Sequence, residues 1–99
     1  MNNQQPTVTA AVTPYGSPYV TLTPARTMDL WGRQAYVDTV YWDKDYACYM
    51  ARGAYARKDG TRGRQRAHTP VNGSIIPADV ADALAPLLPA DAPQPGPRL

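Results

Sequence analysis

The chain lacks most of the residues on which catalytic sites and extracellular folds depend. It contains one cysteine, one histidine and no phenylalanine, and all eight of its acidic residues are aspartate. Because Cys48 is alone, no intrachain disulfide is possible, which favours a reducing compartment such as the cytoplasm. No apolar run approaches the about 20 residues of a membrane-spanning helix, and the N-terminus has no signal-peptide pattern. We therefore expect a cytoplasmic protein that is not embedded in a membrane.

The same scarcity argues against catalysis and against a metal site. His68 is the only histidine, so a histidine-based metal site has almost no ligands to draw on. The strand register predicted below places Cys48 and His68 on opposite faces of a sheet, which excludes a Cys–His nucleophile. Asp38, Asp43 and Asp45 lie around a turn but match no calcium-binding loop. We expect a non-enzymatic protein with no cofactor and no metal ion.

Composition divides the 99 residues into three parts. Residues 1–6 are polar and patternless, and are predicted to form a disordered tail. Residues 89–99 carry four prolines in eleven residues, which predicts a second, extended and disordered tail. Residues 7–88 then form a single small domain, of a size that buries only about 60% of its unfolded surface. A partner or self-association would help to stabilise so small a core.

Strand signals dominate this domain. The predicted strands, rich in β-branched or aromatic residues, span 7–13, 19–23, 34–42, 46–58 and 62–71. A Pro/Gly turn joins the first two into a hairpin, and residues 24–32 are predicted to be a connection. The alanines of 46–58 would also suit a helix. A strand is favoured there because the segment runs into Asp59-Gly60, a strong hairpin signal.

One helix is predicted after the strands. Pro77 suits a first helical position, and Ile76, Val80 and Leu84 recur at helical spacing, which gives the helix one apolar face. Pro86 should end it. The predicted fold is therefore an α+β domain with a small antiparallel sheet, made of an N-terminal hairpin and a three-stranded meander. The C-terminal helix packs on this sheet.

The register of the last hairpin predicts which side chains share a face. With Asp59 and Gly60 as a two-residue loop, Arg57 faces Arg62. A three-residue loop at 59–61 would shift one strand by one residue and turn its side chains to the other face. The predicted exposed face holds Tyr49, Tyr55, Arg57, Arg62, Arg64, Arg66 and His68. A three-residue loop at 43–45 predicts the opposite, core face to hold Tyr36, Val40, Trp42, Tyr46, Cys48, Met50 and Val71, with Arg52 and Asp38 near its edge.

The exposed face carries the functional hypothesis. Six of the ten Lys/Arg residues fall between Arg52 and Arg66, and Asp59 is the only acid among them. Planar guanidinium groups beside tyrosine rings suit phosphate contacts combined with base stacking. The sequence therefore predicts a nucleic-acid-binding module whose candidate site residues are Tyr49, Tyr55, Arg57, Arg62, Arg64 and Arg66. It carries no zinc-finger spacing, RNP-type strand or helix-turn-helix pattern.

The alternative is a protein-interaction module or a structural accessory protein of a bacterium or phage. Tyrosine and tryptophan are enriched at protein interfaces, and an aromatic surface would then bind a protein partner or a second copy. In that case the arginines only keep the exposed strands soluble. Salt separates the two hypotheses, since phosphate binding weakens steeply with ionic strength and an aromatic interface does not.

Overall fold

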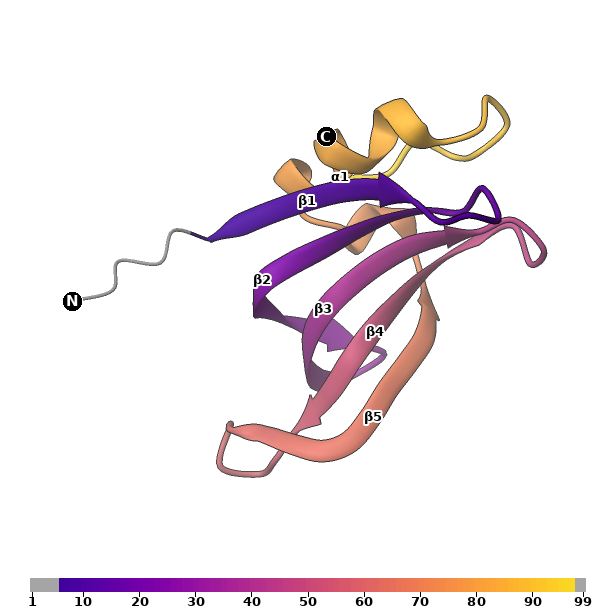
Figure 1. Cartoon of the computed structure of the whole chain (residues 1–99). Helices are drawn as coiled ribbons and strands as arrows, with labels where there is room; N and C mark the ends of the chain where they lie inside the picture. The colour runs from indigo at the N-terminus through magenta and orange to yellow at the C-terminus, as the bar shows by residue number, and fades with distance from the viewer. Residues whose placement is uncertain (1–5, 98–99) are drawn as a thin grey trace.

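The computed structural model describes residues 6–97 and consists of an open, five-stranded antiparallel sheet with one helix packed on it (Figure 1). The strands are β1 (Thr7–Val12), β2 (Pro18–Leu30), β3 (Arg33–Asp43), β4 (Cys48–Ala56) and β5 (Arg62–Val71). The short helical turns η1 (Gly73–Ile75) and η2 (Ala85–Leu87) flank helix α1 (Ala78–Leu84). The predicted α+β class is confirmed. Most of the predicted N-terminal tail, residues 1–5, lies outside the described residues.

The strands follow one another across the sheet in chain order, and the favoured strand over 46–58 is confirmed as β4. The predicted connection over 24–32 is wrong, because β2 continues to Leu30 and pairs with β3 through a two-residue turn. That turn is Trp31-Gly32, with φ of 58° and 89°. Both values are positive, as a type I′ hairpin turn requires. Pro24 is accommodated because the pairing is interrupted between Thr21 and Arg26, where no ladder N–H is needed.

The sheet bends so that the tip of the β2–β3 hairpin reaches β5. The indole N–H of Trp31 donates to the carbonyl oxygen of Pro70 at 2.6 Å. Close by, Arg33 Nη2 donates to Gln65 Oε1 at 2.9 Å. These contacts join residues more than thirty positions apart, and they curve the sheet around its apolar face.

Helix α1 closes the core by packing against β1 and β2 (Figure 1). Its predicted apolar stripe is confirmed, since Ile76, Val80 and Leu84 are fully buried. The sheet contributes the larger buried side chains Val20, Leu22, Met28, Leu30, Val37, Val40, Trp42, Tyr49 and Val71. Burying one such aliphatic side chain stabilises a fold by about 1.5–3 kcal/mol. The face of the sheet that carries these residues is the core face below, and the opposite one is the outer face.

The described part of the predicted C-terminal tail, residues 89–97, contains no helix or strand. It is nevertheless in contact with the domain, because Pro95 and Gly96 are buried. Gly96 N donates to Gly73 O at 2.9 Å, and the Tyr49 hydroxyl donates to the Pro93 carbonyl oxygen. This segment thus covers one end of the core.

One ion pair joins the helix to the sheet and gives a pH-dependent prediction. Arg26 Nη1 donates to Asp79 Oδ1 at 2.8 Å, and this hydrogen bond is the main cause that lowers the pKa of Asp79. A carboxyl group with a lower pKa in the folded state stabilises the fold above its unfolded pKa of about 3.9. That contribution is lost as the pH falls through the folded pKa.

We expect Asp79→Asn to lower the free energy of unfolding at neutral pH by less than about 1 kcal/mol, because the pair is partly solvated. The difference from the unsubstituted protein should vanish as the pH is lowered below about 3.9. Thermal denaturation followed by circular dichroism between acidic and neutral pH measures this. The control is Asp82→Asn, an exposed position on the same helix. A difference that persists unchanged at low pH would contradict the assignment.

Candidate nucleic-acid interface

The turn between β4 and β5 has three residues rather than the predicted two. Arg57 N donates to Thr61 O at 2.7 Å, and Gly60 N donates to Arg57 O at 2.9 Å. Gly60 takes φ of 88°, a left-handed conformation that glycine adopts without strain. The first pair of the ladder is therefore Ala56 with Arg62. The predicted Arg57–Arg62 cross-strand pair is wrong.

The loop before β4 also differs from the prediction, and this changes the position of Tyr49. Asp43 pairs with Cys48 and Trp42 with Tyr49, so four residues, not three, form the loop. Tyr49 consequently lies on the core face and is 3% exposed. Its ring packs edge-on against Trp42 with the ring centroids 4.9 Å apart, and burial raises its pKa. Tyr49 therefore has no exposed ring for a base to stack on.

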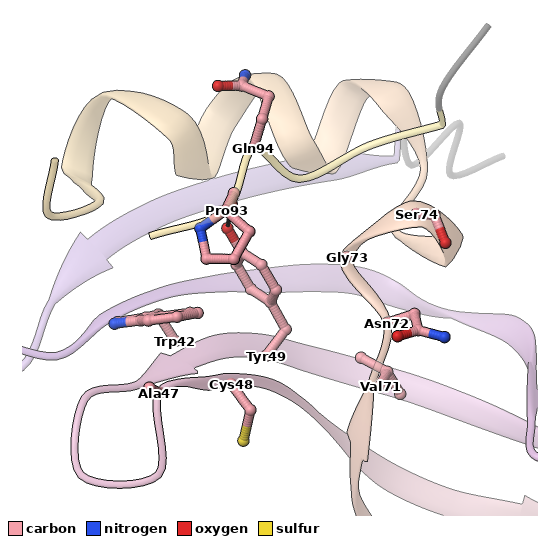
Figure 2. A pocket seen from close by; sticks show the side chains of 10 residues that line it. All are labelled: Trp42, Ala47, Cys48, Tyr49, Val71, Asn72, Gly73, Ser74, Pro93 and Gln94. Atoms are coloured by element: carbon pink, nitrogen blue, oxygen red, sulfur yellow. Dashed lines mark hydrogen bonds between the residues drawn. The ribbon is translucent and has the colours of Figure 1, made fainter. Parts of the chain in front are cut away.

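The side chains at the start of β4 border a hollow at the end of the sheet, and the directions in which they point show which face each of them occupies. Figure 2 shows Tyr49 pointing from β4 toward Pro93, while Cys48 points to the other side of the strand. The hollow has a volume of about 510 Å³ and is lined by side chains that carry no formal charge, among them Asn72 and Gln94. The predicted core positions of Cys48 and Met50 are wrong, since both lie on the outer face, where Cys48 Sγ is 3.7 Å from Met50 Sδ.

The remaining predicted site residues fall into two groups. Tyr55 is only partly exposed, and the guanidinium carbon of Arg33 lies 3.8 Å from the centroid of its ring. Its ring is thus already in a cation–π contact within the chain. Arg57 and Arg64 are exposed near the turn and are not among the residues that line the hollow described next.

The other two predicted arginines come together on the outer face. Arg62 and Arg66 line a hollow of about 390 Å³ with Arg52, Gly53 and Asp38. Arg62 Nη2 lies 3.4 Å from Asp38 Oδ2 in a solvated ion pair. Three arginines and one aspartate thus line this hollow, and this set of residues is called the basic hollow.

A second hollow adjoins the first on the outer face. It measures about 430 Å³ and is called the tyrosine hollow; its lining residues are Thr13, Tyr15, Ser17, Tyr19, Thr39, Tyr41 and Arg52. Tyr19 and Tyr41 are cross-strand partners on β2 and β3. The Tyr41 hydroxyl is 2.6 Å from His68 Nε2, and burial is the main cause that raises the pKa of Tyr41. Arg52 lines both hollows, so they lie next to each other.

Sequence reasoning missed Arg52, Tyr19 and Tyr41 as site residues. Arg52 was expected near the edge of the core face, but it is exposed and pairs with His68 on the outer face. The sequence nevertheless contains a signal for the position of Arg52. If its side chain lay on the core face, the guanidinium group would lose its hydration without gaining a buried partner. That cost favours the register in which Arg52 faces solvent.

The structure also revises the reasoning about catalysis. Cys48 and His68 lie on the same face, not on opposite faces as predicted. His68 pairs with Arg52, four residues along β4 from Cys48, so about 13 Å along the strand and one strand spacing across it separate Cys48 from His68. Burial raises the pKa of the Cys48 thiol, which disfavours the thiolate. Within residues 6–97, no group of three or more His, Cys, Asp or Glu side chains is placed to hold a metal ion.

Comparisons with protein-family models, with curated proteins and with solved structures returned no match. Across the part of the chain that the structure describes, no helix has the length and apolar character needed to span a bilayer. A functional interpretation of the outer face therefore depends on its own geometry and chemistry.

Proposed function

We propose that this protein is a non-enzymatic, cytoplasmic module that binds nucleic acid through the outer face of its sheet. The observation that carries this proposal is the convergence of Arg52, Arg62 and Arg66 on a hollow lined by a single carboxylate, that of Asp38. The excess positive charge of this hollow is +2, which equals the formal net charge of the whole chain.

Guanidinium groups suit this role because each presents a planar fork of donors that matches two phosphate oxygens. Arg62 and Asp38 already form an ion pair, but at 3.4 Å between solvated side chains it is weak. A phosphate group would compete with Asp38 for Arg62. Competition from Asp38 therefore lowers the affinity of the basic hollow for phosphate but does not prevent phosphate from binding.

The test is fluorescence anisotropy with labelled oligonucleotides at low and at near-physiological salt. Against the unsubstituted protein, we expect Arg52→Gln/Arg62→Gln/Arg66→Gln to bind about 30- to 100-fold more weakly at low salt. The slope of log K against log salt should also shrink by about two, since each phosphate contact on a single strand contributes about 0.7.

Two matched variants sharpen this test. Arg57→Gln/Arg64→Gln removes two exposed arginines from the same hairpin and should lower affinity by no more than about threefold. Asp38→Asn keeps an oxygen that can accept from the Thr39 hydroxyl but removes the competing charge, so affinity should rise. Equal losses in the two arginine variants would place binding elsewhere. An absence of binding at low salt would favour a protein partner instead.

A further inference from the structure

The tyrosine hollow has a chemistry that phosphate binding alone does not require. Its wall combines the rings of Tyr15, Tyr19 and Tyr41 with the hydroxyl-bearing residues Thr13 and Ser17. Its volume of about 430 Å³ lies in the about 300–1,000 Å³ range of small-ligand sites. Aromatic faces beside groups that donate and accept hydrogen bonds suit a nucleobase, which stacks by its face and bonds by its edge.

One ring of this hollow and the backbone of one of its loops are held in place before any ligand binds. Tyr41 is fixed by its contact with His68 and lies opposite Tyr19 in the β2–β3 ladder. Tyr15 is 82% exposed on the β1–β2 loop, and its carbonyl oxygen accepts from Lys44 Nζ at 2.8 Å. Lys44 therefore tethers this loop to the β3–β4 loop. A preorganised stacking surface loses less entropy on binding than a mobile one.

The order of charges along the outer face is informative. From one end of β3 to the other, Lys44 comes first, then the ring of Tyr41, then Arg52 and the basic hollow. The path from position 43 to position 37 is about 20 Å at the rise of a β-strand. Cations thus lie on both sides of the aromatic surface, in the pattern of a phosphate, a base and a further phosphate.

We infer that the ligand is a single strand, one base of which enters the tyrosine hollow while neighbouring phosphates contact Arg52 and the basic hollow. This inference rests on the proposed function and narrows its ligand class. In a duplex the bases are stacked and paired, so a base can reach a hollow in a sheet only after it is extruded, which costs free energy. A single strand offers its bases without that cost.

The test uses the full chain and ligands of about ten nucleotides, which exceed the path along β3. These are a single-stranded DNA, the same sequence as RNA, its DNA duplex, and the single-stranded DNA with abasic sites at its centre. We expect the duplex and the abasic strand to bind at least about tenfold more weakly than the intact DNA strand. The comparison of RNA with single-stranded DNA shows which sugar the site prefers. Tight binding of either intact single strand supports the inference.

Variants separate stacking from charge. Tyr41→Leu and Tyr19→Leu should each lose about tenfold in affinity for the single strand with an unchanged salt slope. Tyr41→Phe keeps the ring and should bind within about threefold, which would show that the ring and not the hydroxyl carries the affinity. Tyr46→Leu, at an 81% exposed residue outside the hollow, is the control.

Two contrary outcomes are distinguishable. If duplex, abasic and intact strands bind equally well and the tyrosine variants are unchanged, the inference is overturned while the proposed function stands. If no oligonucleotide binds at low salt, both are overturned. The abasic comparison uses the unsubstituted protein, so it remains decisive even if a tyrosine variant fails to fold.

Discussion

Replacing Gly53 with alanine is expected to destabilise the protein by about 3 kcal/mol or more. A Cβ atom built at Gly53 would lie 1.8 Å from the carbonyl oxygen of Tyr36 and 2.9 Å from Cα of Val37. Both are backbone atoms of β3, so no side-chain rotation relieves the overlap. β3 and β4 approach closely there because the ladder shifts register between Val37 and Thr39. Relief would require the two central strands to separate.

The loss should appear in urea denaturation and as a fall in Tm of at least about 12 °C, given the usual scaling for a domain of this size. The matched control is Gly16→Ala, because Gly16 also lies in a hairpin region but has open space around it. Gly16 has φ of 84°, so alanine there should cost only about 1 kcal/mol of left-handed strain. Equal stability of the two variants would show that the strands adjust without cost.

The second large effect is expected at Trp42, where Trp42→Ala should lower the free energy of unfolding by about 3–5 kcal/mol. The side chain is 4% exposed and packs edge-on against Tyr49, whose hydroxyl in turn bonds to Pro93. Removing the indole leaves a void at the end of the core and removes the support of Tyr49. The C-terminal segment should loosen with it.

The chain provides its own control in its other tryptophan. Trp31 is 68% exposed at the tip of the β2–β3 hairpin, and its main contact is the hydrogen bond to Pro70 O. Trp31→Ala should therefore cost no more than about 1 kcal/mol. Each variant retains one indole, so emission should be blue-shifted in Trp31→Ala and red-shifted in Trp42→Ala. The opposite assignment of emission or stability would refute this description of the core.

Periodicity and turn signals were enough to predict the fold class, the existence of the five strands and of helix α1, and the apolar face of this helix. The extension of β2 could not be predicted by the same means. Pro24 normally ends a strand, and it is tolerated here only because the ladder is interrupted beside it. Trp31 in a left-handed conformation is likewise a poor turn signal by residue type. Both depend on tertiary contacts of the bent sheet.

The candidate site was predicted in part because two register errors cancelled. The predicted three-residue loop at 43–45 would pair Trp42 with Tyr46, but Trp42 pairs with Tyr49, a shift of three residues. The predicted pairing of Arg57 with Arg62 would also place Gly53 opposite Arg66, but Gly53 pairs with Ala67, a shift of one residue. Each odd shift reverses the faces of a strand. β4 was therefore inverted, which misplaced Tyr49 and Arg52, whereas the second reversal restored β5.

Loop length was thus the decisive unknown for the site. The Asp43 side chain accepts from the backbone N–H groups of Asp45 and Tyr46, which stabilises a four-residue loop. Aspartate at a turn suits loops of several lengths, so the residue type alone does not decide between three and four. The outward preference of Arg52 was the better guide, since a charge on the core face costs more than a suboptimal turn.

The strand order has a consequence for how the chain reaches this structure. Each strand pairs only with its neighbours in sequence, and the loops between them are short. Sheet formation therefore closes no long loop, and loop closure is what slows the folding of most β-rich topologies. On the ribosome, β1 and β2 can pair while β5 is still being synthesised. Two steps must wait until the chain is nearly complete. One is the packing of α1 on β1 and β2, with the Arg26–Asp79 ion pair across 53 positions, and the other is the docking of residues 93–96 onto Tyr49, 44 positions away from Pro93.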